Sequence, residues 1–241
     1  KPEVTPPPAI TVSCEAGLDV SVTGDIQATD NCTPGALLIV NITDDATGIV
    51  GCNHTGTLKR TWVVSDLCGN SKSVTQNIRI VDVTPPTIIC AGSLQVSCGE
   101  SMDPSVLGSP EISDNCTAPA DMDLLHFDNT TGLSGCNGTG TMFRTWVVYD
   151  DCGNSNSCIQ TIQVVDNTAP VIELPANITI SCEYRDNDDE LGRATATDAC
   201  TQVDDIVITY SDNDNGLALC NSTGQRERVW KATDLCGNFS T

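Results

Sequence analysis

Arg60-Thr61-Trp62-Val63-Val64-Ser65-Asp66-Leu67-Cys68-Gly69-Asn70 is one of three related stretches in this chain. The other two span residues 144–154 and 228–238, and their tryptophans recur at intervals of 84 residues. A fixed period of this length is the sequence signature of a repeat protein. We therefore expect three tandem domains, called repeats 1, 2 and 3 below, over residues 1–83, 84–167 and 168–241.

Each repeat has the pattern of an all-β domain. Apolar and β-branched runs alternate with Gly, Pro, Asn and Asp, and no long helical period is present. In repeat 1 this pattern predicts strands over residues 9–14, 25–30, 36–43, 57–66 and 74–82. Leu58, Trp62 and Val64 share one face and form the expected core, and Arg60 on that face is expected at the strand's end or stacked on the indole. The predicted fold class is an immunoglobulin-like β-sandwich.

Cysteines provide the second periodic signal. Four positions recur in phase: Cys14, Cys32, Cys52 and Cys68, then Cys98, Cys116, Cys136 and Cys152, then Cys182, Cys200, Cys220 and Cys236. Domains this small need reinforcement, and an even, periodic set of 14 cysteines indicates disulfides formed in an oxidising compartment. Thiolate metal sites are the alternative, but the chain has no Cys-x-x-Cys pair and only two histidines. We expect the chain to be extracellular, secreted or on a cell surface.

Strand direction suggests how the cysteines pair. In an immunoglobulin-like sandwich, Cys14 and Cys52 lie at one end of repeat 1, and Cys32 and Cys68 lie at the other. Joining Cys14 to Cys32 would span a strand of about 20 Å, far beyond the ~7 Å that a disulfide permits between Cα atoms. We therefore predict Cys14–Cys52 and Cys32–Cys68, repeated in phase. The two cysteines outside the period, Cys90 and Cys158, are predicted to bond to each other within repeat 2.

The net charge of −21, from 32 acidic and 11 basic residues, disfavours nucleic acid and anionic membrane surfaces as partners. The sequence has no apolar run as long as the ~20 residues of a transmembrane helix, so no membrane span is expected. Dense carboxylates suit a calcium-rich medium, although they also keep a long array soluble.

Several acidic residues should meet where one repeat follows another. Asp82 precedes the linker into repeat 2 and should approach Asp114, Asp150 and Asn154. In the next repeat Asp166 should approach Asp198, Asp234 and Asn238, while Asp30 and Asp66 are the corresponding residues of repeat 1. Carboxylate and amide oxygens are the ligands that Ca²⁺ prefers. Asx turns and strand ends are the alternative explanation for these residues.

The chain contains nine Asn-x-Ser/Thr acceptors for N-linked glycans. Three keep the period and follow the third cysteine of each repeat, where an exposed loop is expected: Asn53, Asn137 and Asn221. The others are Asn31, Asn41, Asn115, Asn129, Asn177 and Asn238. We expect the periodic three to be modified if the source glycosylates, whereas some of the rest can arise by chance because Asn and Thr suit turns.

The linkers Val81-Asp82-Val83-Thr84-Pro85-Pro86 and Val165-Asp166-Asn167-Thr168-Ala169-Pro170 are short, and proline stiffens them. Repeat 3 lacks the segment in phase with Cys158–Thr168, its last strand. Two explanations remain open: the sequence is a window on a longer array, which we favour, or a neighbouring chain supplies the strand by β-augmentation.

Together, Asp30-Asn31-Cys32, the tryptophan stretch and the linker resemble the hyalin-type immunoglobulin-like repeats of extracellular adhesive proteins. The resemblance covers all three repeats, with Ala199 in place of the Asn at the third Asp-x-Cys. It implies adhesion or scaffolding by long arrays. The linkers also resemble those of cadherins, which implies joints stiffened by calcium.

The sequence disfavours an enzyme. His54 and His126 are out of phase and have no neighbouring nucleophile, and neither a Gly-x-Ser-x-Gly elbow nor a phosphate loop is present. The expected function is a non-catalytic, glycosylated, calcium-stabilised array that forms or decorates an extracellular filament and associates end to end or continues into a longer array. The alternative is a surface adhesin that binds a receptor or glycan through loops such as residues 185–191.

Overall fold

The tryptophan stretch of repeat 1 forms strand β5, Gly56–Ser65. Side chains alternate across a pleated strand, and Leu58, Arg60, Trp62 and Val64 all lie on the buried face of β5. Leu58 packs in a core cluster with Val12, Ile78 and Ile80, which come from the next two strands of the same sheet. The predicted core face is confirmed.

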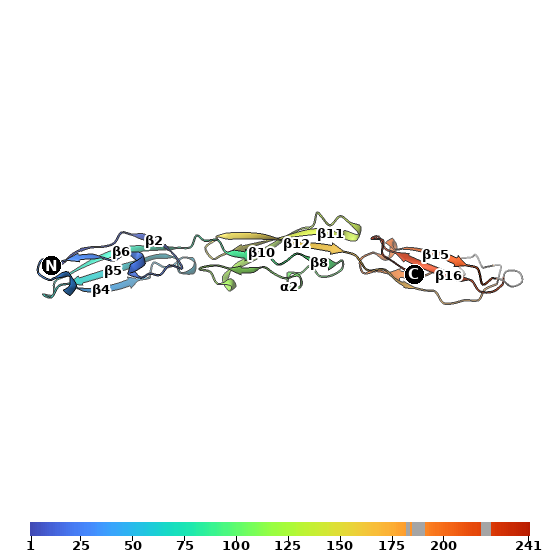
Figure 1. Cartoon of the computed structure of the whole chain (residues 1–241), viewed down its shortest axis with the longest axis horizontal. Helices are drawn as coiled ribbons and strands as arrows, with labels where there is room; N and C mark the ends of the chain where they lie inside the picture. Colours follow the sequence, from blue (N-terminus) through green and yellow to red (C-terminus); the bar gives the residue numbers. More distant parts are fainter. Residues whose placement is uncertain (182–183, 185–190, 218–222) are drawn as a thin grey trace. The chain divides into compact units, whose positions relative to one another are not determined.

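The computed structural model describes residues 1–181, 184, 191–217 and 223–241. In repeat 1 a four-stranded sheet has the order β2-β6-β5-β4, with a two-stranded sheet of β1 and β3 (Figure 1). The bounds are β1 Glu3–Thr5, β2 Ile10–Ser13, β3 Gln27–Thr29, β4 Ile39–Asp45 and β6 Ser71–Val81. β5 runs antiparallel to β4 and β6, whereas β2 runs parallel to β6. β2 and β5 are therefore antiparallel.

Repeats 2 and 3 use the same plan. In repeat 2 the sheets are β10-β11-β12-β8 and β7-β9, with bounds β7 Thr87–Ile89, β8 Leu94–Ser97, β9 Glu111–Ser113, β10 Asp123–Asn129, β11 Gly140–Tyr149 and β12 Ser155–Val165. In repeat 3 the described sheets are β13-β14 and β15-β16-β17, with bounds β13 Val171–Glu173, β14 Thr195–Thr197, β15 Val207–Asn213, β16 Glu227–Thr233 and β17 Phe239–Ser240. The predicted all-β class of tandem immunoglobulin-like repeats is confirmed.

Backbone contacts divide the described chain into two compact units. Unit 1 comprises Lys1–Cys90, Pro110–His126 and Trp146–Cys158, and unit 2 comprises Ala91–Ser109, Phe127–Thr145 and Ile159–Thr241. The boundary thus runs through repeat 2, so that each unit contains one end of repeat 2 together with the repeat that adjoins that end. The division into three domains at residues 83 and 167 stays a prediction.

Within residues 1–181, the structure has two single-turn helices that were not expected from the sequence. They are α1, Val20–Thr23, and α2, Pro104–Leu107, and each is capped by an aspartate whose carboxylate accepts a hydrogen bond from a backbone N–H of the first turn. Helices of four residues are too short to leave a helical period in the sequence. Short 3₁₀ turns also occur: η1 Gly35–Leu37, η2 Cys52–His54, η3 Pro119–Asp121, η4 Cys136–Gly138 and η6 Val203–Asp205.

Arg60 lies in the middle of β5 and not at its end. Its buried guanidinium forms an ion pair with Asp44. Its Nε and Nη2 each lie 2.8 Å from a carboxylate oxygen of Asp44 on β4, and its Nη1 donates to the Thr23 hydroxyl. The guanidinium also lies 6.0 Å from the centre of the Trp62 ring, in accordance with the alternative expectation of a ring contact. The predicted position at the end of the strand is wrong, because Asp44 and Thr23 satisfy the charge inside the sheet.

Candidate metal centre

Three carboxylates meet at each described joint between repeats. In unit 1 these are Asp82, Asp114 and Asp150, which offer ligand oxygens within 4.8 Å of one another. In unit 2, Asp166, Asp198 and Asp234 meet in the same way. We call the first cluster joint 1 and the second joint 2. Both clusters were predicted from the sequence.

The strands explain why the three residues of joint 1 converge. Asp82 directly follows β6 of repeat 1. Asp114 and Asp150 directly follow β9 and β11, at the end of repeat 2 that belongs to unit 1. The linker therefore brings the residue that follows the last strand of repeat 1 to the loops after β9 and β11 of repeat 2.

Tight turns aim these carboxylates into the joint. Oδ1 of Asp114 accepts hydrogen bonds from the backbone N–H groups of Cys116 and Thr117 at 2.9 and 2.8 Å, which is an Asx turn. Its Oδ2 is buried and receives no hydrogen bond. Asp82 is similar, because Oδ1 accepts from the Thr84 N–H at 3.2 Å whereas the buried Oδ2 accepts none. One oxygen makes the turn and the other remains available to a ligand, so the two interpretations of these aspartates are compatible.

The tryptophan stretch ends in the turn that presents the third carboxylate. Asp150 Oδ1 accepts from the backbone N–H groups of Cys152 and Asn154, and Gly153 adopts a φ of +86° that favours glycine. The Asn154 amide donates to Asp150 Oδ2 at 2.8 Å and to the Asp82 carbonyl at 3.4 Å. Asn154 thus positions Asp150 and the linker through its amide nitrogen, and its role as an oxygen ligand stays a prediction. Asn238 makes the equivalent contacts with Asp234 and Asp166 in joint 2.

The pKa of Asp82 is shifted in the opposite direction from the pKa values of Asp30 and Asp66, which lie at the other end of repeat 1. Burial raises the pKa of Asp82, the nearby charges of Asp114 and Asp150 raise it further, and the hydrogen bond from Thr84 only partly opposes the shift. Backbone hydrogen bonds from Cys32 and Thr33 instead lower the pKa of Asp30. Joint 1 therefore holds negative charge in a place where a cation would stabilise it.

The donor set fits a hard cation. Buried carboxylate oxygens without hydrogen-bond partners are costly, and Asp82, Asp114 and Asp166 each present one at a joint. Calcium prefers carboxylate, carbonyl and water oxygens, and magnesium usually retains more of its water. A Ca²⁺ ion at joint 1 would be held by Asp82, Asp114 and Asp150, and one at joint 2 by Asp166, Asp198 and Asp234. Such an ion would neutralise carboxylates that belong to two successive repeats.

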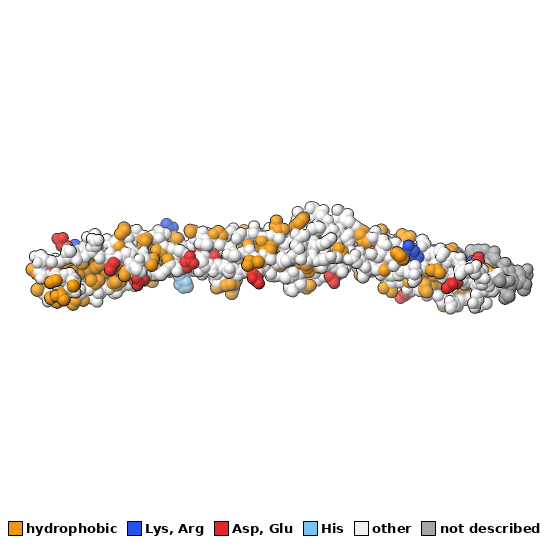
Figure 2. All heavy atoms as spheres, in the orientation of Figure 1, with side chains coloured by type: hydrophobic (Ala, Val, Ile, Leu, Met, Phe, Trp, Pro, Cys, Tyr) orange, Lys and Arg blue, Asp and Glu red, His pale blue; other side chains and the backbone are white. Residues whose placement is uncertain are grey.

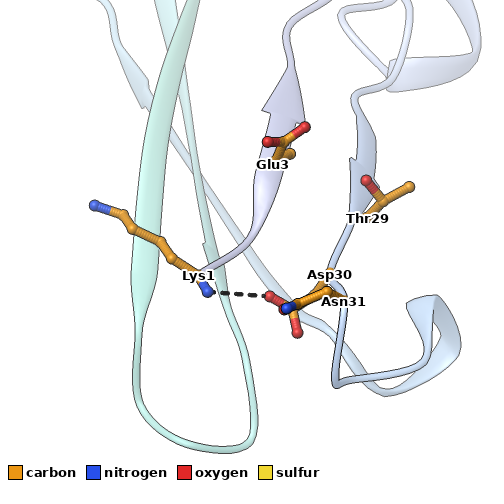
Figure 3. A pocket seen from close by; sticks show the side chains of 5 residues that line it. All are labelled: Lys1, Glu3, Thr29, Asp30 and Asn31. Atoms are coloured by element: carbon orange, nitrogen blue, oxygen red, sulfur yellow. Dashed lines mark ion pairs between the residues drawn. The ribbon is translucent and has the colours of Figure 1, made fainter.

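The corresponding end of repeat 1 carries the same two turns, and a positive charge lies between their carboxylates. The Lys1 ammonium is 3.3 Å from Oδ2 of Asp30 (Figure 3) and 3.8 Å from Oδ2 of Asp66. Asp30 and Asp66 are in phase with Asp114 and Asp150.

Disulfides cross both joints. In unit 1, Cys14 bonds to Cys116 and Cys52 bonds to Cys152. In unit 2, Cys98 bonds to Cys200 and Cys136 bonds to Cys236. At each joint the first and third cysteines of one repeat thus bond to the second and fourth cysteines of the next. The carboxylate cluster is held by covalent bonds on both sides of the linker.

These bonds correct the predicted pairing within repeats. Cys14–Cys52 and Cys32–Cys68 are wrong, and so are their equivalents Cys98–Cys136, Cys116–Cys152 and Cys200–Cys236. Each cysteine lies at the end of its domain that strand direction predicts, but its partner belongs to the neighbouring repeat. Cys90–Cys158 is confirmed. The predicted pair Cys182–Cys220 lies outside the described residues.

Polar side chains also join the repeats, and the sequence analysis missed them. The Asn53 amide in η2 donates to the hydroxyl of Thr117, and the Asn137 amide in η4 donates to that of Thr201. Thr117 and Thr201 are buried, and Asn53 adopts the left-handed backbone conformation that asparagine tolerates. The threonine after the second cysteine is in phase in all three repeats, so the sequence did contain a signal.

This arrangement changes the interpretation of the glycan acceptors. Asn53 and Asn137 are half-buried at the joints, so the expectation of an exposed loop there is wrong. Asn31, Asn41, Asn129 and Asn177 are exposed, and Asn115 and Asn238 are half-buried. Asn221 lies outside the described residues, as do residues 185–190 of the candidate binding loop. Glycosylation itself stays a prediction.

The fold and the joints define a class of protein: tandem immunoglobulin-like repeats that disulfides connect end to end. No family model and no curated protein sequence matches this chain. Solved structures that resemble it include human CDH23 EC21-23, with 15% identity over 89% of this chain and 85% of that one and a TM-score of 0.36. Human Protocadherin-24 EC1-2 has 14% identity over 69% of this chain and 99% of that one, with a TM-score of 0.33. PcdhgB3 EC1-4 has 11% identity over 99% of this chain and 73% of that one, with a TM-score of 0.32. In the described residues, no helix has the length and apolarity needed to cross a membrane.

Proposed function

We propose that this chain is a non-catalytic extracellular structural glycoprotein, a tandem array that forms or decorates a filament and is stabilised by calcium at its joints. The observation that carries the proposal is the convergence of three carboxylates at each disulfide-bonded joint, with buried oxygens that accept no hydrogen bond. Five disulfides among the described cysteines support an oxidising, extracellular location.

The surface charge is consistent with this proposal. The face drawn in Figure 2 carries more acidic than basic side chains, in keeping with the net charge of −21. The ion pairs made by Arg60, Arg144, Arg226 and Arg228 use carboxylates away from the two joints. These four ion pairs leave the joint carboxylates of the described residues open to a cation from the medium.

Calcium should raise the thermal stability of the chain, and the joint carboxylates should account for that increase. We expect a higher melting temperature with Ca²⁺ than with a chelator, because a ligand at 100 times its Kd contributes about 2.7 kcal/mol per site. The double variant Asp114→Asn, Asp198→Asn removes one charge from each joint, while its side-chain oxygens can still accept the Asx-turn hydrogen bonds. Calorimetry should show that the variant loses most of the calcium-dependent shift.

Asp45→Asn is the matched control, because exposed Asp45 makes an Asx turn with Thr47 away from the joints. It should retain the full shift. Equal melting temperatures of the unmodified chain in calcium and in chelator would contradict the calcium part of the proposal.

Adhesion is the second candidate function. Its supporting observation is an exposed edge strand with apolar side chains: Ile39, Val40 and Ile42 on β4 are 54%, 43% and 45% exposed. Leu125 and Phe127 on the edge strand β10 are also exposed. Binding of labelled chain to cells or glycan arrays that is lost in an Ile39→Asp, Ile42→Asp variant would favour adhesion over a purely structural role.

A further inference from the structure

The two joints share their three carboxylates but differ in the residues beside them. Three positions carry a side-chain oxygen in joint 1 and none in joint 2. The residues at these positions are Glu15, Asn115 and Asp151 in joint 1 and, in phase with them, Gly99, Ala199 and Leu235 in joint 2. The break in the Asp-Asn-Cys motif at Ala199 therefore coincides with two further losses of side-chain oxygen at the same joint.

Asn115 brings an amide oxygen to joint 1. Its Nδ2 donates to the sulfurs of the joint disulfide, at 3.0 Å from Cys116 Sγ and 3.6 Å from Cys14 Sγ. These two sulfurs and a carboxylate oxygen of Asp82 lie within 4.8 Å of one another, so the amide belongs to the joint. Its Oδ1 is buried and accepts no hydrogen bond, like the Oδ2 atoms of Asp82 and Asp114. Such an oxygen is costly unless a ligand binds it, and amide oxygens are ligands that calcium accepts.

Glu15 brings a fourth carboxylate to the neighbourhood of the same site. It is exposed and directly follows Cys14, whose sulfur lies beside Asp82. Burial raises the pKa of Asp82, and the negative charges of Asp114, Asp150 and Glu15 add to this shift. The charge of Glu15 therefore acts on the group that carries the linker's carboxylate.

The corresponding positions of joint 2 hold no carboxylate. Gly99 takes the place of Glu15, and Glu100, one residue later, accepts a hydrogen bond from the Ser97 backbone N–H at 3.0 Å. Leu235 takes the place of Asp151, which directly follows Asp150 in joint 1. Charges within about 8 Å of one another are only partly screened at physiological salt. Joint 1 thus combines a stronger negative field with one more buried oxygen.

We infer that joint 1 binds Ca²⁺ more tightly than joint 2, with Asn115 as an additional oxygen ligand and Glu15 as a carboxylate that raises the affinity. The affinity of calcium sites depends on the charge and number of their oxygen ligands. Because this difference concerns the calcium sites of the proposed function, it rests on calcium binding at both joints. As calcium rises, joint 1 fills first, and joint 2 fills at a concentration higher by about tenfold.

The test is a calorimetric titration of the full chain with calcium chloride. The chain is produced without N-linked glycans, because Asn115 is an acceptor. We expect two binding steps whose Kd values differ by about tenfold. Asn115→Ala should weaken the tighter step, and Ala199→Asn should strengthen the weaker one, since exposed Ala199 leaves room for an amide. Asn31→Ala is the matched control, because exposed Asn31 is in phase with both positions but belongs to neither joint, and it should change neither step.

Glu15→Gln separates charge from ligation. It should weaken the tighter step by a larger factor at low salt than at high salt, because salt screens the lost charge. The loss in Asn115→Ala should vary less with salt, because an uncharged ligand is removed.

The Cys14–Cys116 peptide from each unreduced variant reports whether joint 1 has formed. Two equal steps in the unmodified chain would overturn the inference and leave the proposed function standing. The same holds for an Asn115→Ala chain with an intact joint and an unchanged tighter step, and for an Ala199→Asn chain with an unchanged weaker step. Absence of calcium binding at both joints would overturn the calcium part of the proposed function itself.

Discussion

Arg60 illustrates how a charged residue occupies the buried face of a strand. Its guanidinium makes two hydrogen bonds to Asp44 and one to Thr23, so that three donors are satisfied in the interior. The hydrogen bonds from Arg60 lower the pKa of Asp44, and the positive charge of Arg60 adds to this shift. The ion pair therefore connects edge strand β4 to the core of repeat 1.

Asp44→Asn should destabilise repeat 1 by about 1–2 kcal/mol, because a buried guanidinium loses its counter-charge while the partly exposed carboxylate is screened by solvent. A lowered pKa means that the pair contributes fully above the ordinary Asp value of about 3.9, and that the contribution is lost as the pH falls through the folded-state pKa. The difference in melting temperature between the two proteins should be constant from pH 7 to 5 and should shrink below about pH 4. A difference that grows in acid would contradict this explanation, and Asp45→Asn provides the control.

Single residues were the scale at which sequence reasoning was least complete. Leu58, Trp62 and Val64 could be placed in the core from their two-residue spacing alone. The partner of Arg60 could not be identified, because Asp44 and Asp45 are adjacent and only the pairing of β4 with β5 selects between them. Similarly, the hydrogen bond of Asn53 joins residues separated by 64 positions in the chain.

Among the structural elements, the loops after β3, β9 and β14 carry the residues that form the joints. Five of the six strands of repeat 1 were predicted to within about three residues, because alternation and turn residues mark them, whereas β1 was not predicted. Each loop after β3, β9 or β14 uses an aspartate Oδ1 to bind the next backbone N–H groups, which fixes the cysteine and the threonine that follow. The repeated Asp-x-Cys-Thr is thus a turn motif and a docking motif together.

Thr117→Val should weaken joint 1 by about 1–3 kcal/mol, since the buried hydroxyl accepts the Asn53 amide and valine cannot accept it. Thr117→Ser retains a hydroxyl and should lose less. Denaturant unfolding of both variants measures the difference. Equal losses in the two variants would show that the methyl group of Thr117, rather than its hydroxyl, is what the joint requires.

For the whole molecule, disulfides between repeats have a different consequence from disulfides inside them. Pairing within a repeat would close loops of about 40 residues and would leave the joints to the linkers alone. The observed bonds at the joints join cysteines 100 or 102 residues apart and connect each repeat to the next. A closed loop of 100 residues stabilises the folded state by about 4.7 kcal/mol in the chain-entropy model. Covalent joints of this kind support the array proposed above.

The repeat period, the all-β class and both carboxylate clusters could be predicted from the sequence, because each depends on spacing within a strand-and-turn pattern. The cysteine pairing could not, because it depends on which domain ends face one another. The prediction was correct that Cys14 and Cys52 lie at one end of repeat 1 and that Cys32 and Cys68 lie at the other end. Applying the same period to the ends of neighbouring repeats would have suggested Cys14–Cys116 as an alternative.

Peptide mapping of the unreduced chain by mass spectrometry tests the joints most directly. Free thiols are first alkylated in acid to prevent exchange, and the chain is then cleaved without reduction. We expect Cys14 linked to Cys116, Cys52 to Cys152, Cys98 to Cys200 and Cys136 to Cys236, with Cys90 linked to Cys158. Peptides that join Cys14 to Cys52 and Cys98 to Cys136 would contradict the covalent joints, and with them the array proposed for this chain.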